Sequence, residues 1–299
     1  MFIQQLINGI TLGSIYALIA LGYTLVYGIL RMINFAHSEI FMIGAFLALG
    51  SLFFPGMNAL PGWIQLIIAF LVAMIGSAII GYLIERIAYK PLRYATRLAP
   101  LISAIGVSIF LQNIIFVWIS NQSLPFPEIF TIHQFHFANS DINSLQIFII
   151  LISLILMISL HFFIQKTRLG KALRATASDR ETAELLGINT HAIISLTFIL
   201  GGALGGAGGL LNGMYYGSIK YNMGFLPGIK AFTAAVLGGV GNISGAVMGG
   251  LLIGILESLG AGYLPGGSEW KDIFSFAVLV LVLYFRPQGI LGEKIVDKV

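Results

Sequence analysis

The sequence has no cysteine and very little charge. Without cysteine, the 299 residues contain no disulfide, no thiolate metal ligand and no cysteine nucleophile. Only 9% of the residues are charged, against about 25% in an average soluble domain, while 58% are hydrophobic. A soluble globular protein needs more polar surface than this, and a disordered chain needs low hydrophobicity with high charge. Both classes are therefore excluded.

Long apolar runs predict a helical membrane protein. A membrane-spanning helix needs about 20 apolar residues, whereas barrel strands alternate over about ten. We therefore expect an all-α, polytopic membrane bundle with eight or nine spans and no separate soluble domain. The runs cover residues 6–30, 33–54, 63–84, 98–119, 145–164, 192–211, 225–260 and 270–285. The run 225–260 is interrupted, so it is interpreted either as two short spans or as one span with a re-entrant element.

The positions of Lys and Arg predict the orientation, because both accumulate on the cytoplasmic side. They cluster at 86–97, 166–180 and 286–298, whereas the loop 121–143 has none and is expected outside. Arg31 then lies inside, the N-terminus outside and the C-terminus inside. The exceptions are Lys220, Lys230 and Lys271.

The loop 165–191 is predicted to hold a short helix on the cytoplasmic face. Residues 171–186 contain no Gly or Pro and are rich in good helix formers, and Gly187 is a helix-stop signal. A helix this short is marginal alone in water and needs a surface to dock on. Anionic lipid headgroups suit its basic residues. Its three acids, Asp179, Glu181 and Glu184, favour docking on another protein.

Several motifs resemble one known family. Residues 181–187, Glu-Thr-Ala-Glu-Leu-Leu-Gly, resemble the E-A-A-x-x-x-G signature of ABC importer permeases, with Thr182 in place of an alanine. The I-x-L-P of other importer classes does not follow it. The whole chain is similar to the H-type permease subunits of high-affinity branched-chain amino acid importers. The segments that carry this similarity are 8–29, 32–46, 85–93, 101–113, 186–190, 228–250 and 286–292.

The resemblance implies one importer permease domain over 1–299, in the bacterial cytoplasmic (inner) membrane, that moves branched-chain amino acids. The implied partners are an M-type permease in a heterodimer, two ABC ATPase subunits, an extracytoplasmic substrate-binding protein and membrane lipid, with no nucleic acid. The chain has no phosphate-binding G-x-x-x-x-G-K-[ST] loop, so we expect a transport subunit that is not itself an enzyme. ATP and Mg are expected on the partner ATPase subunits, and no cofactor or metal is expected on this chain. The residues expected to couple to the ATPase are Arg174, Asp179, Arg180, Glu181, Ala183 and Gly187.

Polar residues within the spans are candidates for a pathway or gate. Asn34, His37 and Glu39 are expected at the cytoplasmic start of the second span, although a helix N-terminus alone would favour an acid there. Tyr23 and Tyr27 fit the wall of an amphipathic route or ordinary helix contacts. Gln112 and Asn113 could form hydrogen bonds between helices. Glu257 could pair with Lys271 or with a partner chain. His133 and His136 are interpreted as part of a solvated loop rather than as a metal pair.

Glycines recur every four residues in two rows. Such rows let helices pack closely, either as plain tight packing or as interfaces that slide during transport. The rows are Gly201, Gly205 and Gly209, and Gly241, Gly245 and Gly249.

Other functions remain as alternatives. A urea or short-chain amide importer permease would have a similar sequence. A secondary transporter needs an ionisable residue near the bilayer centre, and the runs are interpreted as having none there. A passive channel needs no helix of the kind predicted at 171–186. An intramembrane enzyme is disfavoured because G-x-S-x-G and H-E-x-x-H are absent.

Overall fold

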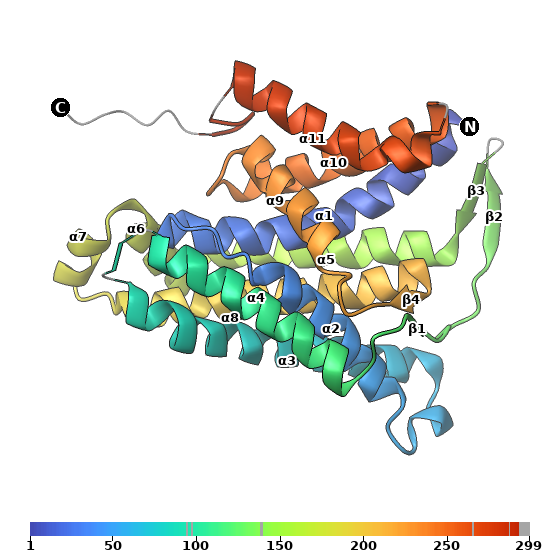
Figure 1. Cartoon of the computed structure of the whole chain (residues 1–299), viewed down its shortest axis with the longest axis horizontal. Helices are drawn as coiled ribbons and strands as arrows, with labels where there is room; N and C mark the ends of the chain where they lie inside the picture. Colours follow the sequence, from blue (N-terminus) through green and yellow to red (C-terminus); the bar gives the residue numbers. More distant parts are fainter. Residues whose placement is uncertain (94, 97, 138–139, 265, 287, 293–299) are drawn as a thin grey trace.

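The computed structural model is an elongated bundle of helices (Figure 1). It describes residues 1–93, 95–96, 98–137, 140–264, 266–286 and 288–292. The helices are α1 Phe2–Leu30, α2 His37–Leu52, α3 Gly62–Ile84, α4 Leu98–Trp118, α5 Ser144–Lys166, α6 Arg168–Ser178, α7 Arg180–Leu185, α8 Thr190–Tyr216, α9 Phe225–Gly238, α10 Ile243–Tyr263 and α11 Gly267–Phe285. Short helical turns cover Met57–Ala59, Glu85–Tyr89 and Lys90–Leu92.

Four short strands form two antiparallel pairs at one end of the bundle. β1 (Leu124–Pro125) pairs with β4 (Ser218–Ile219), and β2 (Gln134–Phe137) pairs with β3 (Ser140–Asn143). The loop 121–143, predicted to be solvated, therefore contains a hairpin. In it, exposed His136 bonds to exposed Asp141.

Six described helices are long and apolar enough to cross a membrane, and α2 and α9 are shorter apolar helices. The six are α1, α3 with the turns that follow it, α4, α5, α8 and α10. The prediction of an all-α polytopic membrane bundle is confirmed. The uncertainty over 225–260 is also resolved, because this run divides into short α9 and full-length α10.

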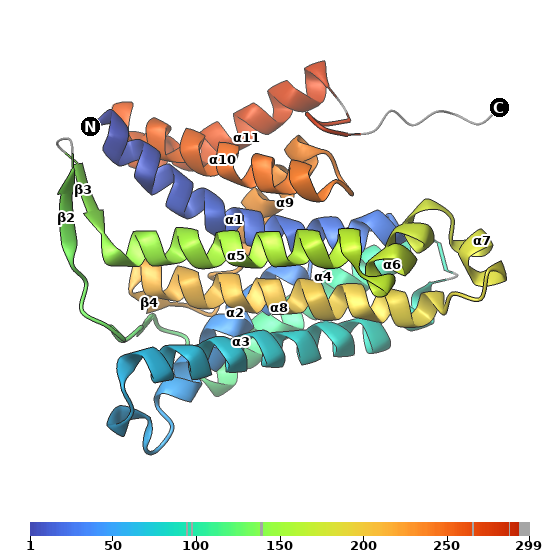
Figure 2. The same cartoon turned by 180° about the vertical axis from the view of Figure 1, so that it is seen from behind.

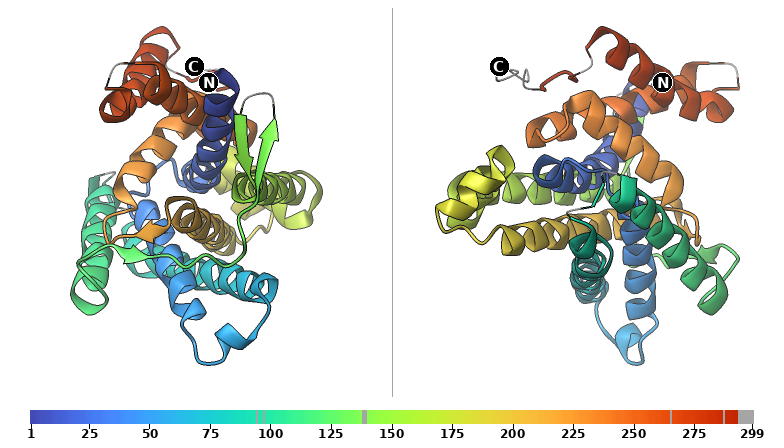
Figure 3. Two further views of the ribbon diagram at one scale, coloured as in Figure 1. Left: turned by 90° about the vertical axis from the view of Figure 1, so that its right-hand side faces the viewer. Right: turned by 60° about the vertical axis from the view of Figure 1, so that its left-hand side comes forward.

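α1 and α8 form the centre of the bundle. In the most apolar window of each, 89% of the α1 residues and 72% of the α8 residues are buried, against 11% for α4. An end-on view shows α8 enclosed by its neighbours (Figure 3, left), and α8 lies between α5 and α3 in the reverse view (Figure 2). α3, α4 and α5 expose large apolar side chains such as Ile75, Ile109 and Leu151, as lipid-facing or partner-facing helices do.

The two short helices both begin inside the bundle. α2 begins at His37, whose ring lies against Gly22 of α1 and Gly205 in the middle of α8. α9 begins close to the same place, because a Cβ on Gly224 would lie 2.2 Å from the Ser38 carbonyl oxygen. With about 1.5 Å per residue, neither helix spans the roughly 30 Å hydrocarbon core. The segments 31–36 and 220–224 therefore lead into the two helices as irregular chain, buried at Asn34, Ala36 and Gly224 next to each helix and exposed at Arg31 and Lys220.

This arrangement corrects one prediction. Asn34, His37 and Glu39 do not lie at the cytoplasmic start of a span, because they sit deep in the bundle with at most 1% of each residue exposed. The hydropathy of 33–54 is that of a full span, but the helix occupies only 37–52. Hydropathy does not distinguish an apolar irregular segment from an apolar helix.

Glycine rows bring helices into backbone contact. Gly201 faces Gly22 of α1, and Gly209 lies against the Phe41 carbonyl of α2. Gly245 and Gly249 pack α10 against α9, where added Cβ atoms would lie 2.2 and 2.0 Å from the carbonyl oxygens of Gly238 and Ala234. Gly205 faces the His37 ring. Gly241 departs from the predicted row, because it lies in the α9–α10 turn with φ +92°.

The predicted cytoplasmic elements gather at one end of the bundle. The ends of α1 and α3 and the start of α4 lie there beside α6 and α7, while the N-terminus and the strands lie at the other end (Figure 1). We refer to these as the α7 end and the strand end. Arg97, Lys294 and Lys298, which also support the predicted orientation, lie outside the described residues.

We predict that Gly209→Ala destabilises the protein by about 1–3 kcal/mol, because the added Cβ would lie 2.0 Å from the Phe41 carbonyl oxygen. Gly50→Ala is the matched control, since that exposed α2 glycine has nothing within 4 Å of an added Cβ. Thermal unfolding in detergent compares the two. Equal melting temperatures for both variants would contradict the packing described here.

Candidate coupling and translocation sites

The loop 165–191 forms two helices instead of the single predicted helix. α6 ends at Ser178 and α7 begins at Arg180, with Asp179 in extended conformation between them. The Asp179 carboxylate accepts hydrogen bonds from the Thr182 backbone nitrogen (3.1 Å) and hydroxyl (2.7 Å). Asp is among the preferred helix N-caps because its side chain satisfies backbone N–H groups that the first turn leaves unpaired. Asp179 is thus a structural cap between two helices.

α7 ends at Leu185, and the predicted helix-stop residue Gly187 follows its C-cap, Leu186. The Gly187 nitrogen donates to the Glu184 carbonyl, and the Ile188 nitrogen donates to the Ala183 carbonyl. This is a Schellman motif, whose left-handed residue is usually glycine, and Gly187 has φ +83°. Its role in the structure is to turn the chain from α7 toward α8.

The helix pair is fastened to the bundle by polar contacts. Thr167 caps α6 at the Gly170 nitrogen, and the Arg174 guanidinium donates to the Ile164 carbonyl at the end of α5. Glu184 accepts hydrogen bonds from Thr190, the first residue of α8, and from Arg180. These bonds, that from Thr190 first, hold the pKa of the Glu184 carboxyl below its usual value.

The side chains that α7 leaves exposed differ from the predicted set. Ala183 is buried, and Arg174, Asp179 and Arg180 take part in the contacts above. Glu181 is exposed, as are Leu185 at 89% and Leu186 at 75%. Two leucines this exposed at the tip of a bundle form an apolar surface that sequence reasoning missed. The sequence signal that could have indicated it is the position of both leucines directly before the helix-stop residue Gly187.

A second polar cluster lies at the start of α8. Arg93 pairs with Glu85 and bonds to His191, and the Ser195 hydroxyl donates to Glu85 at 2.7 Å. The Glu85 and Arg93 side chains are at most 3% exposed. Removing one partner of a buried ion pair leaves an uncompensated charge. The cluster therefore fixes the end of α3 to α8 beside α7, a link that the sequence did not reveal.

Glu39 occupies the centre of the bundle. Its residue is fully buried, and Oε1 accepts hydrogen bonds from the Gln112 amide at 2.8 Å, the Ser108 hydroxyl at 3.2 Å and the Ser38 hydroxyl at 3.2 Å. The prediction that Gln112 bonds between helices is confirmed, whereas the Asn113 amide bonds within α4 to Ile109. The interpretation that no ionisable group lies centrally is wrong. The sequence argument against a secondary transporter, which relied on the lack of a central ionisable group, therefore does not hold.

The other predicted pathway residues surround Glu39 only in part. Asn34 accepts a hydrogen bond from the Tyr89 hydroxyl at 3.1 Å, and His37 contacts the Tyr23 ring edge to face with centroids 4.9 Å apart. Tyr23 and Tyr27 line a narrow gap with Phe232 of α9. His37 and the two tyrosines therefore form an aromatic wall between α1, α2 and α9, whereas Asn34 bonds to the turn that follows α3.

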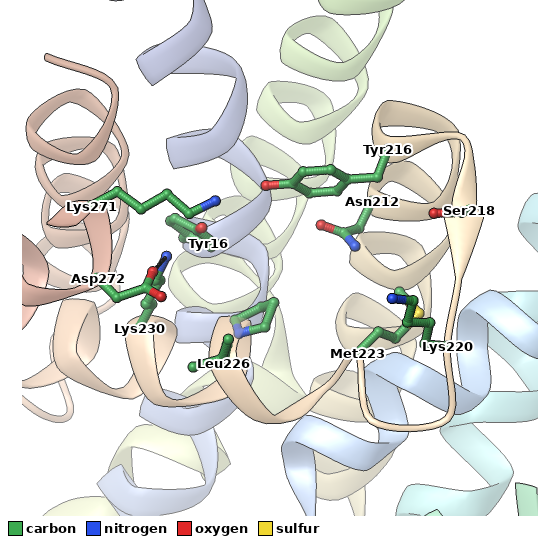
Figure 4. Close-up of a pocket in the computed structure, with 11 residues that line it drawn as sticks. Tyr16, Asn212, Tyr216, Ser218, Lys220, Met223, Leu226, Lys230, Lys271 and Asp272 are labelled. Atoms are coloured by element: carbon green, nitrogen blue, oxygen red, sulfur yellow. Dashed lines mark ion pairs between the residues drawn. The ribbon is translucent and has the colours of Figure 1, made fainter. Parts of the chain in front are cut away.

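A third set of polar residues lies toward the strand end. Glu257 of α10 pairs with Lys230 of α9 at 2.8 Å and accepts a hydrogen bond from the Tyr16 hydroxyl at 3.0 Å. The sequence predicted Lys271 or another chain as the partner of Glu257, whereas the structure pairs Glu257 with Lys230. Lys230 also pairs with Asp272 at 2.6 Å beside a cavity of about 240 Å³, which Lys271 lines as well (Figure 4).

Within the described part of the chain, no group of three or more His, Asp or Glu could hold a metal ion.

Comparison with known proteins places these features in a family. The family described as branched-chain amino acid transport system / permease component matches residues 5–283. The chain is 48% identical to the high-affinity branched-chain amino acid transport system permease protein BraD of Pseudomonas aeruginosa, with 100% of this chain and 98% of that protein covered. It is 46% identical to LivH of Escherichia coli K12, with the same coverage. A probable branched-chain amino acid transport permease protein LivH of Methanocaldococcus jannaschii is 32% identical, with 95% of this chain and 91% of that protein covered.

We predict an energetic coupling of about 0.5–3 kcal/mol between Glu39 and Gln112, because the Gln112 amide donates a part-buried hydrogen bond to the Glu39 carboxyl group. Unfolding of Glu39→Ala, Gln112→Ala and the double variant in detergent measures it. Ser108→Ala gives a second cycle with Glu39, and Asn113→Ala is the control because its side chain bonds within α4. Additive effects of the Glu39 and Gln112 changes would refute the contact.

Proposed function

Because this multi-pass chain of the cytoplasmic membrane belongs to the family of branched-chain amino acid transport system permease components, we propose that it is the permease subunit of an ABC importer for branched-chain amino acids. The observation that carries the proposal is the 48% identity to a branched-chain amino acid transport permease over 100% of this chain and 98% of that protein. The proposal treats 1–299 as one permease domain whose loop 165–191 couples it to the ATPase.

The α6–α7 pair supports coupling to a separate ATPase. The pair lies at the tip of the bundle, where the apolar side chains of Leu185 and Leu186 are exposed. Glu184 connects the pair to α8, because it accepts a hydrogen bond from Thr190, the first residue of that helix. The sequence has no phosphate-binding loop, so ATP and Mg would be held by partner chains. Of the two docking surfaces considered for this loop, the apolar tip between acidic residues fits a protein cleft better than anionic lipid.

The proposed assembly follows the same logic. An M-type permease would complete a heterodimer, and two ABC ATPase subunits would dock at the α7 end. An extracytoplasmic binding protein would deliver the amino acid to the strand end. Exposed apolar residues on α3, α4 and α5 are available for lipid and for the second permease. Nucleic acid has no place in this scheme.

We expect vesicles that contain the full complex to accumulate labelled leucine only when ATP reaches the ATPase side and the binding protein is present outside. Isoleucine and valine should compete, whereas urea and acetamide should not. Competition by urea or acetamide in place of isoleucine and valine would reassign the ligand. ATP-independent accumulation by this chain alone would indicate a secondary transporter or channel and would overturn the proposal.

We predict that Leu185→Asp with Leu186→Asp abolishes co-purification of the ATPase subunits, because both leucines are exposed and would lose apolar burial in a docking cleft. Leu169→Asp is the matched control, since Leu169 is a half-exposed leucine on neighbouring α6. Pull-down from detergent extracts gives the result, and unchanged melting temperature of the permease shows that folding is intact. Full ATPase recovery with the double variant would reject α7 as the docking helix.

A further inference from the structure

A cavity of about 240 Å³ opens near the strand end of the bundle. α11 forms one wall with Lys271 and Asp272, and the end of α8 with the following strand forms the opposite wall (Figure 4). Leu226 and Pro227 of α9 line it from a third side. The volume lies just below the roughly 300–1,000 Å³ of sites for drug-sized ligands, which suits a ligand the size of one amino acid.

A buried lysine organises the charged wall. The Lys230 side chain is 4% exposed, and its ammonium lies 2.8 Å from Glu257, 2.6 Å from Asp272 and 5.7 Å from the centre of the Tyr16 ring. Glu257, at 2% exposure, compensates the lysine from the inside. The Asp272 carboxylate is 32% exposed and lines the cavity. A carboxylate has about four acceptor sites, so this ion pair leaves Asp272 able to accept further hydrogen bonds.

The remaining wall has groups of opposite charge and an apolar floor. Asp272 is the acid among the described residues that line the cavity, and Lys271 and Lys220 supply ammonium groups from two different walls. Figure 4 shows Lys271 extending over the cavity toward Tyr216. Met223, Leu226 and Pro227 supply apolar surface. One acid, two lysines besides the ion-paired Lys230, and an apolar floor complement a molecule that carries an ammonium, a carboxylate and a hydrocarbon side chain.

We propose that this cavity is a subsite for a free zwitterionic α-amino acid at the outer side of the permease. The α-ammonium donates to Asp272, the α-carboxylate accepts from Lys271 and Lys220, and the hydrocarbon side chain lies on Met223 and Leu226. The inference rests on the proposed function and extends it, because it gives this permease its own contact with the two charged ends of the substrate. Lys230 and Glu257 act as positioning residues that hold Asp272.

The test measures binding of two ligands to the purified full complex in detergent without the binding protein. Labelled leucine has both charged ends, whereas 4-methylpentanoate is leucine without its amino group. Asp272→Asn should weaken leucine binding about tenfold or more and leave 4-methylpentanoate binding unchanged, because only leucine presents an ammonium to residue 272. Lys271→Met should weaken both ligands similarly, since both carry the carboxylate.

Glu128→Gln is the matched control, because Glu128 is an exposed acid outside the cavity. Asp272→Glu should restore leucine binding in part, which separates a ligand contact from general damage to the fold. Leucine binding unaffected by Asp272→Asn, or both ligands weakened equally by it, would overturn the subsite.

The result is independent of the transport assay. If the wild-type complex showed no ATP-driven leucine uptake, the proposed function would be refuted even if the cavity bound leucine. Normal uptake with no selective effect of Asp272→Asn would refute the subsite alone.

Discussion

Inside a membrane no water satisfies polar backbone groups, and this constraint shapes the centre of the bundle. The irregular segments 31–36 and 220–224 lead into α2 and α9, whose first turns meet at Ser38 and Gly224. In a membrane such chain is tolerated where protein buries it or where it lines a cavity, as Lys220 and Met223 do. The glycines of α1 and α8 let α2 approach until His37 lies against Gly22 and Gly205. The two most buried of the six long apolar helices therefore enclose the start of a short one.

Buried charge is handled in two ways. Glu39 is held by neutral donors from its own helix and from α4, so its contacts bridge two helices without a counter-charge from the residues named here. Lys230 instead lies between Glu257 and Asp272, and Glu85 pairs with Arg93. Buried ion pairs gain little over apolar packing, because desolvation offsets their attraction. They do fix which helices meet, since either partner alone would leave an uncompensated charge.

The sequence predicted what depends on composition over long windows and missed what depends on contacts across the fold. Hydropathy located the long spans because lipid demands about 20 apolar residues. It could not separate the irregular residues 33–36 from helix α2, because both belong to one apolar run. The break at Asp179 was readable from its capping preference, with Thr182 three residues on. The Lys230–Glu257 pair joins residues 27 apart on two helices, and no local pattern gives that register.

α8 connects all the sites described above. Its first residue, Thr190, bonds to Glu184 of α7, and one turn further Ser195 bonds to Glu85. Its middle packs at Gly205 against His37, and its last turns present Asn212 and Tyr216 to the cavity. α8 is thus one continuous helix that joins the α7 end to the cavity near the strand end. The glycines of α8 leave backbone surfaces in contact with α1, α2 and α3, with few side chains to interlock. Surfaces of this kind, smooth and held by backbone contacts, are compatible with the sliding of helices that the proposed importer would require.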